Sequence, residues 1–348
     1  MNISKKILSI LISAVLLVDL PLSGCSPGSY GRTPVSLSFF ALNTLSTITI
    51  YTSLPGIKAS EVLDSCRELV LKYEDVLSRT KKTSDIYRIN HSAGRPVTVS
   101  ETTLELIRKG IEYSELSNGM FDITIAPVIE LWGFGTDEMN GIPDKAALKE
   151  ALSHVSFRNI LLDEEALTVQ LADPASKLDL GAIAKGYIAD RVKERLKESG
   201  VTGAVIDLGG NILTLGSKPG GKPFNVAIKA PFTDTSSYYM GRELPEDSIA
   251  ASVEITDRSV VTSGIYERYR LVDGVMYHHI LDPRTGFPVD NTLASATVIS
   301  DTSLEGDCLS TVCLLLGRKQ AEALIKARPR LQAILIEKDG TVTRVNSL

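Results

Sequence analysis

Hydrophobic and polar residues along this chain repeat with two periods, one typical of strands and one of helices. Residues 38–52, rich in Thr and Ile, alternate as in a strand, whereas residues 58–77 repeat about every 3.6 positions. The same helical period predicts helices at 101–118, 144–153, 182–198, 304–316 and 318–327. Strands are predicted at 203–215 around a Gly-Gly turn, at 224–229, at several places within 248–299 and, as a hairpin, at 331–345. Because helices and hairpins interleave without regular βαβ units, we expect an α+β fold.

The first 36 residues are predicted to precede the folded domain, which we place at residues 37–348. The chain has a basic start followed by the apolar residues 7–18. This apolar run is too short for a membrane span. The small residues before Cys25 resemble a bacterial lipoprotein signal, so that residues 1–24 would be removed and Cys25 would carry a lipid. Residues 25–36 form a Pro/Gly/Ser-rich tether. This predicts a lipid-anchored protein on the extracytoplasmic face of the cell membrane. An ordinary secretory signal with an incidental cysteine is the alternative.

The charge of the chain argues against nucleic acid as a partner. It has 37 Lys and Arg against 42 Asp and Glu, a formal net charge of −5, whereas nucleic-acid-binding proteins are typically basic. None of the four cysteines lies in a C-x-x-C pair that would indicate zinc. Cys308 and Cys313 are five positions apart in a predicted helix, so their side chains diverge and we expect no disulfide.

The segment from Asp179 to Asp190 combines a carboxylate, a lysine and several small residues at a predicted helix start. Small residues let a ligand approach a helix backbone closely, and the free N–H groups of a helix start favour anions such as phosphate. Small residues at helical spacing more often reflect close packing of one helix against another. The segment therefore suggests a phosphate-bearing ligand, with helix packing as the alternative.

A second cluster, Asp307, Ser310 and Thr311, has the spacing that places side chains on one face of a helix. One carboxylate and two hydroxyls are hard oxygen donors suited to Mg²⁺, which takes few protein ligands and keeps waters or phosphates. The alternative is a helix N-terminus with Asp as its cap and Ser/Thr bonding back to carbonyls.

Three further clusters carry candidate chemistry. His278 and His279 would point to opposite faces of a strand, and one of them could act as a general acid or base or simply pack. Ser263 and Gly264 could present backbone N–H groups to a phosphate or form a turn. Phe121 and Trp132 could flank a planar ligand or belong to the core.

Taken together and in this order, these motifs resemble those of the ApbE family, the FAD:protein FMN transferases. The resemblance extends from about residue 40 to the C-terminus, and its most specific parts are 179–190, 262–269, 279–288 and the Asp307 helix. It implies one α+β domain, related to the T-fold, of mixed and mainly antiparallel sheets with packed helices. It also implies an enzyme that uses FAD and Mg²⁺, transfers FMN to a threonine hydroxyl of a partner flavoprotein, and releases AMP.

The resemblance also implies roles for individual residues. Mg²⁺ would be bound by Asp307, Ser310, Thr311 and the backbone carbonyl of Ala182. His279 would be the acid/base, and we expect Asp282 to orient it. The residues expected to bind FAD are Leu42, Thr80, Met120, Phe121, Asp122, Asp179, Lys185, Ser263, Gly264 and Leu281.

Two positions depart from the family pattern. Leu42-Asn43-Thr44 replaces Met-Gly-Thr, and Thr80 lacks the aromatic ring that is common at its position. These departures concern contacts with FAD at Asn43 and Thr80. Two other functions stay open: an FAD pyrophosphatase that yields free FMN and AMP, because water and threonine would use the same site, and a flavin-binding lipoprotein without catalysis. The sequence does not identify the acceptor; in the family it is a flavoprotein with a target threonine, often an electron-transport subunit.

Overall fold

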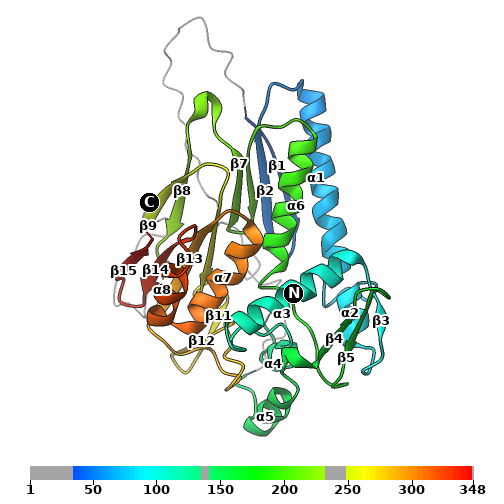
Figure 1. The fold of residues 1–348 in the computed structure, drawn as a ribbon. Coiled ribbons are helices and arrows are strands. Elements are labelled where there is room, and N and C mark those ends of the chain that lie inside the picture. The colour runs from blue at the N-terminus through cyan, green and yellow to red at the C-terminus, as the bar shows by residue number, and fades with distance from the viewer. Residues whose placement is uncertain (1–33, 135–140, 232–247, 347–348) are drawn as a thin grey trace, which may run out of the picture. The chain divides into compact units, whose positions relative to one another are not determined.

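An antiparallel sheet of eight strands is the central element of the unit Arg32–Leu348 (Figure 1). The computed structural model describes residues 34–134, 141–231 and 248–346. The strands follow the order β1-β2-β6-β7-β10-β13-β14-β15, and every neighbouring pair is antiparallel. Their bounds are β1 Pro34–Ala41, β2 Thr44–Tyr51, β6 Gly203–Leu208, β7 Asn211–Gly216, β10 Ser259–Gly264, β13 Leu293–Ser300, β14 Gln332–Glu337 and β15 Val342–Val345.

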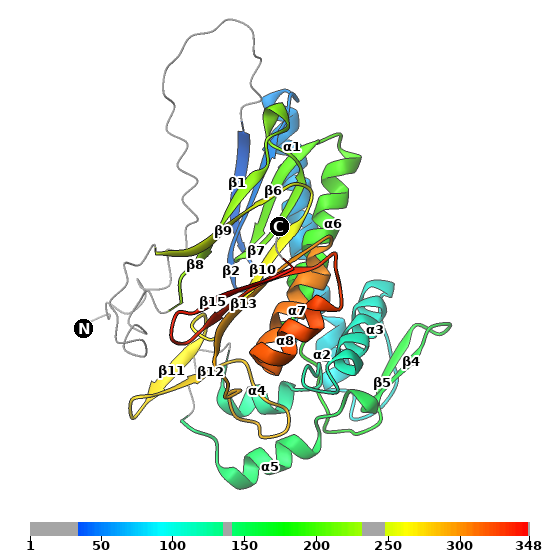
Figure 2. The same ribbon diagram turned by 60° about the vertical axis from the view of Figure 1, so that its left-hand side comes forward.

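The two faces of this sheet are covered differently (Figure 2). Helices α1 (Gly56–Leu77), α6 (Ala184–Glu198), α7 (Ser303–Leu316) and α8 (Arg318–Lys326) pack on one face, where the main apolar core lies. A two-stranded ribbon of β8 (Phe224–Lys229) and β9 (Ile249–Ile255) packs on the other and forms a second core. Because both faces of the sheet are covered, all eight residues of β13 are buried. Each of them is either apolar or small and polar.

Smaller elements surround the N-terminal end of α6. They are α2 (Asp85–Asn90), β3 (Val97–Thr98), α3 (Glu101–Leu116), α4 (Ala126–Trp132), α5 (Lys145–Ser153), β4 (Ile160–Asp163), β5 (Thr168–Leu171), β11 (Tyr269–Val272) and β12 (Val275–His278). Asp85 ties α2 to α3, because its Oδ2 accepts hydrogen bonds from Ser100 N (2.9 Å) and Thr103 Oγ1 (2.7 Å). β11 and β12 form the hairpin that leads to His279.

The α+β class is confirmed, and each predicted helix is present within two residues of its predicted bounds. The prediction of one strand over 38–52 was wrong, because the segment is the β1–β2 hairpin with a turn at Leu42 and Asn43. Both turn residues have positive φ (56° and 57°), which suits Asn but is rare for Leu. The tether was also expected to extend to residue 36, whereas β1 begins at Pro34, a residue that an edge strand tolerates.

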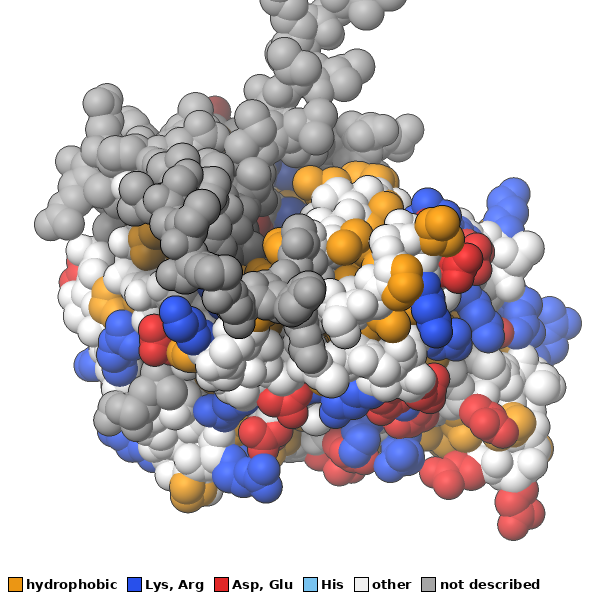
Figure 3. Space-filling view, turned by 90° about the horizontal axis from the view of Figure 1, so that it is seen from above, with side chains coloured by type: hydrophobic (Ala, Val, Ile, Leu, Met, Phe, Trp, Pro, Cys, Tyr) orange, Lys and Arg blue, Asp and Glu red, His pale blue; other side chains and the backbone are white. Residues whose placement is uncertain are grey.

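The predicted signal segment 1–24, Cys25 and the tether up to residue 33 lie outside the described residues. Among the residues that are described, no helix has the length and apolar character needed to cross a membrane. On the face shown in Figure 3, Lys and Arg side chains alternate with Asp and Glu side chains. The described residues of that face thus present mixed charge rather than a continuous basic surface.

The hydrogen bond between His154, at the end of α5, and Asp173 predicts that the stability of the protein depends on pH. The Nδ1 atom of His154 lies 2.7 Å from Asp173 Oδ2, and this hydrogen bond raises the pKa of His154. Because the pKa of His154 is higher in the folded state than in the unfolded state, the protonated ring stabilises the fold. This stabilisation is complete below the ordinary pKa of 6.5 and is lost as the pH rises through the pKa of the folded state.

We therefore expect His154→Gln to lower the melting temperature at about pH 6 and to have little effect at about pH 9. Melting curves of both proteins across this range measure it. The variant Asp173→Asn should abolish the pH dependence, and an equal difference at both ends of the range would contradict the prediction.

Candidate active site

The segment 179–190 brings α6 and α7 into close contact. A Cβ atom added at Gly186 would lie 2.4 Å from the carbonyl oxygen of Ser303 and 2.7 Å from Leu304 Cα. Asp190 accepts hydrogen bonds from the backbone N–H groups of Ser303 (2.8 Å) and Leu304 (2.9 Å), so it caps the start of α7. The helix-packing alternative is therefore correct at Gly186, and the pattern of small residues did not reveal the capping role of Asp190.

Gly186→Ala is expected to destabilise the fold by about 1–3 kcal/mol, because the added methyl group meets backbone atoms that have no room to shift. Thermal unfolding measures the loss. Gly141→Ala serves as the control, since a Cβ there meets nothing within 4 Å. Equal melting temperatures for Gly186→Ala and the unmodified protein would contradict this close approach.

Asp307 lies at the contact between the two helices. Its side chain is buried, and its Oδ2 accepts a hydrogen bond from Gly186 N (2.8 Å), so the anion at the start of α6 is a carboxylate of the protein itself. Burial raises the pKa of Asp307, and the positive charge of Lys185 opposes that rise. Thr302 caps α7, so the interpretation of Asp307 as a helix cap was wrong.

Hydroxyl groups from α7 and β10 form a cluster one helical turn along α7 from Asp307. Ser310 and Thr311 bond back to the carbonyl oxygen of Asp307 (3.0 and 3.4 Å), as the alternative interpretation expected. The Oγ atom of Ser263, near the end of β10, lies 2.8 Å from Ser310 Oγ and 3.0 Å from Thr311 Oγ1. Gly264 leaves room for the Tyr266 ring, since a Cβ there would lie 2.8 Å from it. Two motifs 47 residues apart thus form one hydroxyl cluster.

This donor set fits Mg²⁺ better than a softer metal. No group of three or more His, Cys, Asp and Glu side chains among the described residues could hold a metal ion. The available ligands are the carboxylate of Asp307, the hydroxyls of Ser310 and Thr311, and the carbonyl of Ala182 in the turn before α6. Hard oxygen donors in small number leave positions for waters or phosphate oxygens, as Mg²⁺ prefers.

Lys185 links this cluster to two other parts of the site. Its positive charge opposes the rise that burial causes in the pKa of Asp307 and of Asp207, and it adds to the lowering of the pKa of His279 that burial mainly causes. Sequence reasoning had not singled out Asp207. Its Oδ1 accepts a hydrogen bond from Gly210 N (2.8 Å), and burial raises its pKa overall. One lysine thus acts on acidic and basic groups from three elements.

The predicted FAD residue Leu42 lies at the same end of the sheet. The side chain of Thr44 fills the place that a Cβ of Gly209 would occupy, 2.3 Å from Thr44 Oγ1. The Leu42–Asn43 turn therefore lies beside the Asp207–Gly210 turn, because β2 and β6 are paired. Leu42 is half-buried and Asn43 is exposed.

His279 follows β12 and is half-buried. Its Nδ1 atom and its backbone N–H both lie 3.0 Å from the carbonyl oxygen of Arg268. Because a carbonyl only accepts, Nδ1 carries the proton and Nε2 is left as an acceptor. Burial and the Arg268 guanidinium lower the pKa of His279 to about 3, so the ring is neutral at pH 7. His278 is more deeply buried, and burial lowers its pKa to about 4.

The orienting contact expected between Asp282 and His279 is replaced by a local ion pair. Arg284 Nη2 lies 2.6 Å from Asp282 Oδ2, and Arg284 Nε lies 3.0 Å from Oδ1. The Arg268 carbonyl orients the imidazole instead. The side chain of Leu281 is buried in the cluster around Trp132, so a ligand would meet its backbone.

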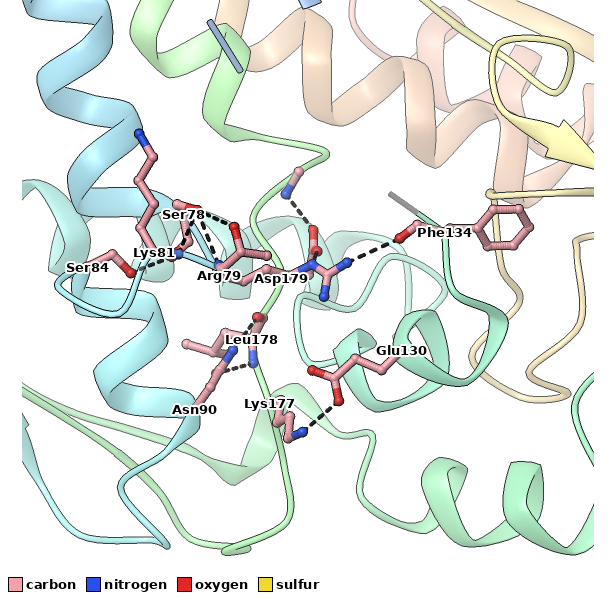
Figure 4. Close-up of polar contacts among 12 residues, drawn as sticks. Ser78, Arg79, Lys81, Ser84, Asn90, Glu130, Phe134, Lys177, Leu178 and Asp179 are labelled. Atoms are coloured by element: carbon pink, nitrogen blue, oxygen red, sulfur yellow. Dashed lines mark hydrogen bonds and ion pairs between the residues drawn. The ribbon is translucent and has the colours of Figure 1, made fainter. Parts of the chain in front are cut away.

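The Asp179 carboxylate is bound by Arg79 and by the backbone of its own segment (Figure 4). Its Oδ2 lies 2.8 Å from Arg79 Nε, and its Oδ1 accepts a hydrogen bond from Gly181 N (2.7 Å). Arg79 Nη2 donates to the carbonyl oxygen of Phe134 (3.2 Å). Thr80, next to Arg79, is exposed and bonds to Ser78.

The aromatic residues that were considered as flanks of a planar ligand belong to the core. Phe121 packs in the main core, and Trp132 packs in a separate cluster, where its Nε1 donates to the Gly286 carbonyl (2.7 Å). Met120 is also buried. Asp122 accepts hydrogen bonds from the backbone N–H groups of Thr124 and Phe157. Contacts between FAD and these residues would therefore come mainly from the backbone.

Comparisons with known proteins agree with these motifs. A model of the ApbE family matches residues 42–335. The FAD:protein FMN transferase of Klebsiella pneumoniae is 40% identical over 79% of this chain and 82% of its own length. That of Treponema pallidum is 34% identical over 91% and 90%. The crystal structure of the ApbE protein of Thermotoga maritima superposes with a TM-score of 0.81 at 30% identity, covering 90% of this chain and 97% of that one.

Proposed function

Because the chain belongs to the ApbE family, we propose that it transfers FMN from FAD to a threonine hydroxyl of an acceptor flavoprotein, with Mg²⁺, and releases AMP. The observation that carries the proposal is the contact of the buried Asp307 carboxylate with Gly186 N at the start of α6 (2.8 Å), next to a hydroxyl cluster in which Ser263 Oγ lies 2.8 Å from Ser310 Oγ and 3.0 Å from Thr311 Oγ1. Transfer between a pyrophosphate and a hydroxyl requires a cation site that neutralises phosphate charge and a neutral base that takes the hydroxyl proton.

The metal would be held by Asp307, Ser310, Thr311 and the Ala182 carbonyl, and it would neutralise charge on the pyrophosphate. The ammonium group of Lys185 would neutralise further phosphate charge. FAD would be held by the remaining residues proposed for it, which are Leu42, Thr80, Met120, Phe121, Asp122, Asp179, Ser263, Gly264 and Leu281.

His279 would take the proton from the acceptor threonine. The threonine oxygen then attacks the phosphorus of the FMN half, the P–O bond to AMP breaks, and AMP leaves with that electron pair. The free Nε2 acceptor and the fixed Nδ1–H suit this role. A pKa of about 3 makes the resting ring a weak base. The negative phosphates of bound FAD would raise its basicity.

One experiment separates transfer from its alternatives. The protein is incubated with FAD and Mg²⁺, with and without a co-expressed acceptor flavoprotein, and products are measured by mass spectrometry. Transfer predicts an acceptor heavier by one FMN and AMP in equal amount. Free FMN without acceptor would indicate a pyrophosphatase, and the absence of AMP in both arms would indicate a binding protein.

We also propose a location for the enzyme. A lipid on Cys25 would hold the domain on the extracytoplasmic face of the membrane, and residues 25–33 would serve as its tether. An acceptor in the same compartment, such as a membrane-bound electron-transport subunit, would then be within reach.

A further inference from the structure

Arg79 connects three segments that are distant in the sequence. It follows directly after α1, and its guanidinium bonds both to the Asp179 carboxylate and to the Phe134 carbonyl (Figure 4). The side chains of Arg79 and Asp179 are only 18% and 17% exposed, so water screens this pair weakly.

We infer that Arg79 is a positioning residue of the FAD site, which fixes the Asp179 carboxylate and ties it to the wall beside His279. This inference rests on the proposed function. It adds a residue that lies next to Thr80 and that neither composition nor spacing had indicated.

The backbone of Asp179 is already fixed without Arg79. The side chain of Asn90 bonds to both the N–H (2.7 Å) and the carbonyl (2.9 Å) of Leu178, and Asp179 N donates to the Ile123 carbonyl (2.8 Å). Arg79 therefore contributes the orientation of the carboxylate rather than the path of the chain. This distinction makes its role separable from general stability.

The arrangement also limits what Asp179 can bind. Each of its oxygens receives one hydrogen bond from the protein and keeps further acceptor capacity. A carboxylate accepts hydrogen bonds but cannot donate them, so it attracts N–H or O–H groups and repels phosphate. We therefore assign to Asp179 a donor-bearing part of the nucleotide, a ring N–H or a hydroxyl, and leave the pyrophosphate to Lys185 and the metal.

The second contact of Arg79, with the Phe134 carbonyl, lies near the proposed base His279. The ring of Phe134, whose carbonyl Arg79 binds, packs edge-on against His279 with centroids 6.5 Å apart, and the Arg270 guanidinium lies 5.1 Å from the same ring. Loss of Arg79 would release the Asp179 carboxylate, whereas the Phe134 ring beside His279 would keep its contacts with Trp132 and Arg270.

The test is a double-mutant cycle on FAD binding and turnover. Arg79→Gln is expected to raise the KM and the Kd for FAD by about 10- to 100-fold, with a smaller change in kcat, because the ligand site and not the base is disturbed. In an Asp179→Asn background, the same change should cost less than about twofold, since Arg79 then has no carboxylate to orient. Arg67→Gln, which removes an exposed pair with Asp64 on α1, is the matched control.

Each other outcome is decisive. Losses that multiply in the double variant, or an equal loss in Arg67→Gln, would overturn the inference. If Arg79→Gln does not fold, Arg79→Lys carries the test, because it keeps the charge but lacks the fork that reaches two acceptors. An unmodified protein that fails to bind FAD would refute the proposed function itself, whereas intact binding in every Arg79 variant would refute only the positioning role.

Discussion

Asp307→Asn is expected to reduce FMN transfer by at least about 100-fold. The loss of the only carboxylate in the proposed ligand set removes most of the attraction for Mg²⁺, and a metal contribution of several kcal/mol corresponds to two or more factors of ten in rate. The change from Asp to Asn is chosen because the amide oxygen still accepts the hydrogen bond from Gly186 N. The fold contact between α6 and α7 is thereby preserved while the charge is lost.

Titration of activity with Mg²⁺ measures this effect. We expect the variant to need far more Mg²⁺ and not to regain full activity at saturation. Asp290→Asn is the control, because this carboxylate is fully exposed on the surface. Full activity of Asp307→Asn at saturating Mg²⁺, with an unchanged melting temperature, would show that Asp307 does not hold the metal.

The elements that could be predicted from sequence are those decided by local chemistry. Ser100 directly precedes α3 and Asp144 directly precedes α5, and each caps its helix with its own side chain. α7 ends at Gly317, whose φ is positive. The β1–β2 hairpin was missed because its turn has no Gly and the alternation of residues continues through it.

Parts of the site that depend on long-range packing could not be read from spacing. Asp190 caps a helix more than 110 residues away, and Asp207 reaches the site only because β6 pairs with β2. Burial also separates similar residues. Trp132 is in the core although its motif resembles a ligand-flanking one, and Asp282 pairs with a neighbour two positions away. The spacing of residues along the sequence shows which of them share a helix or strand, whereas tertiary packing decides which of them face a ligand.

His279→Ala is expected to bind FAD with nearly unchanged affinity and to transfer FMN about 10²- to 10⁴-fold more slowly, the range for a lost general base. Binding of FAD and transfer of FMN are expected to be affected separately, because the imidazole is held by the Arg268 carbonyl and not by the groups proposed to bind FAD. Flavin fluorescence measures binding, and single-turnover mass analysis of the acceptor measures transfer. His91→Ala, which removes an exposed ring stacked on Tyr87, is the control. A collapse of FAD affinity with persisting turnover would show that His279 is a binding residue instead.

The pH profile gives the second test of this base. A base acts only in its neutral form, so activity is lost as the pH falls through its pKa. Since burial and Arg268 lower the pKa of free His279 to about 3, kcat/KM should show no acid limb near the ordinary value of 6.5. An acid limb near 6.5 that disappears in His279→Ala would contradict the depressed pKa while keeping the residue as the base. In kcat, which reports the complex with FAD, the phosphates of FAD bound as proposed would raise the pKa of His279, so a limb at higher pH than in kcat/KM is expected.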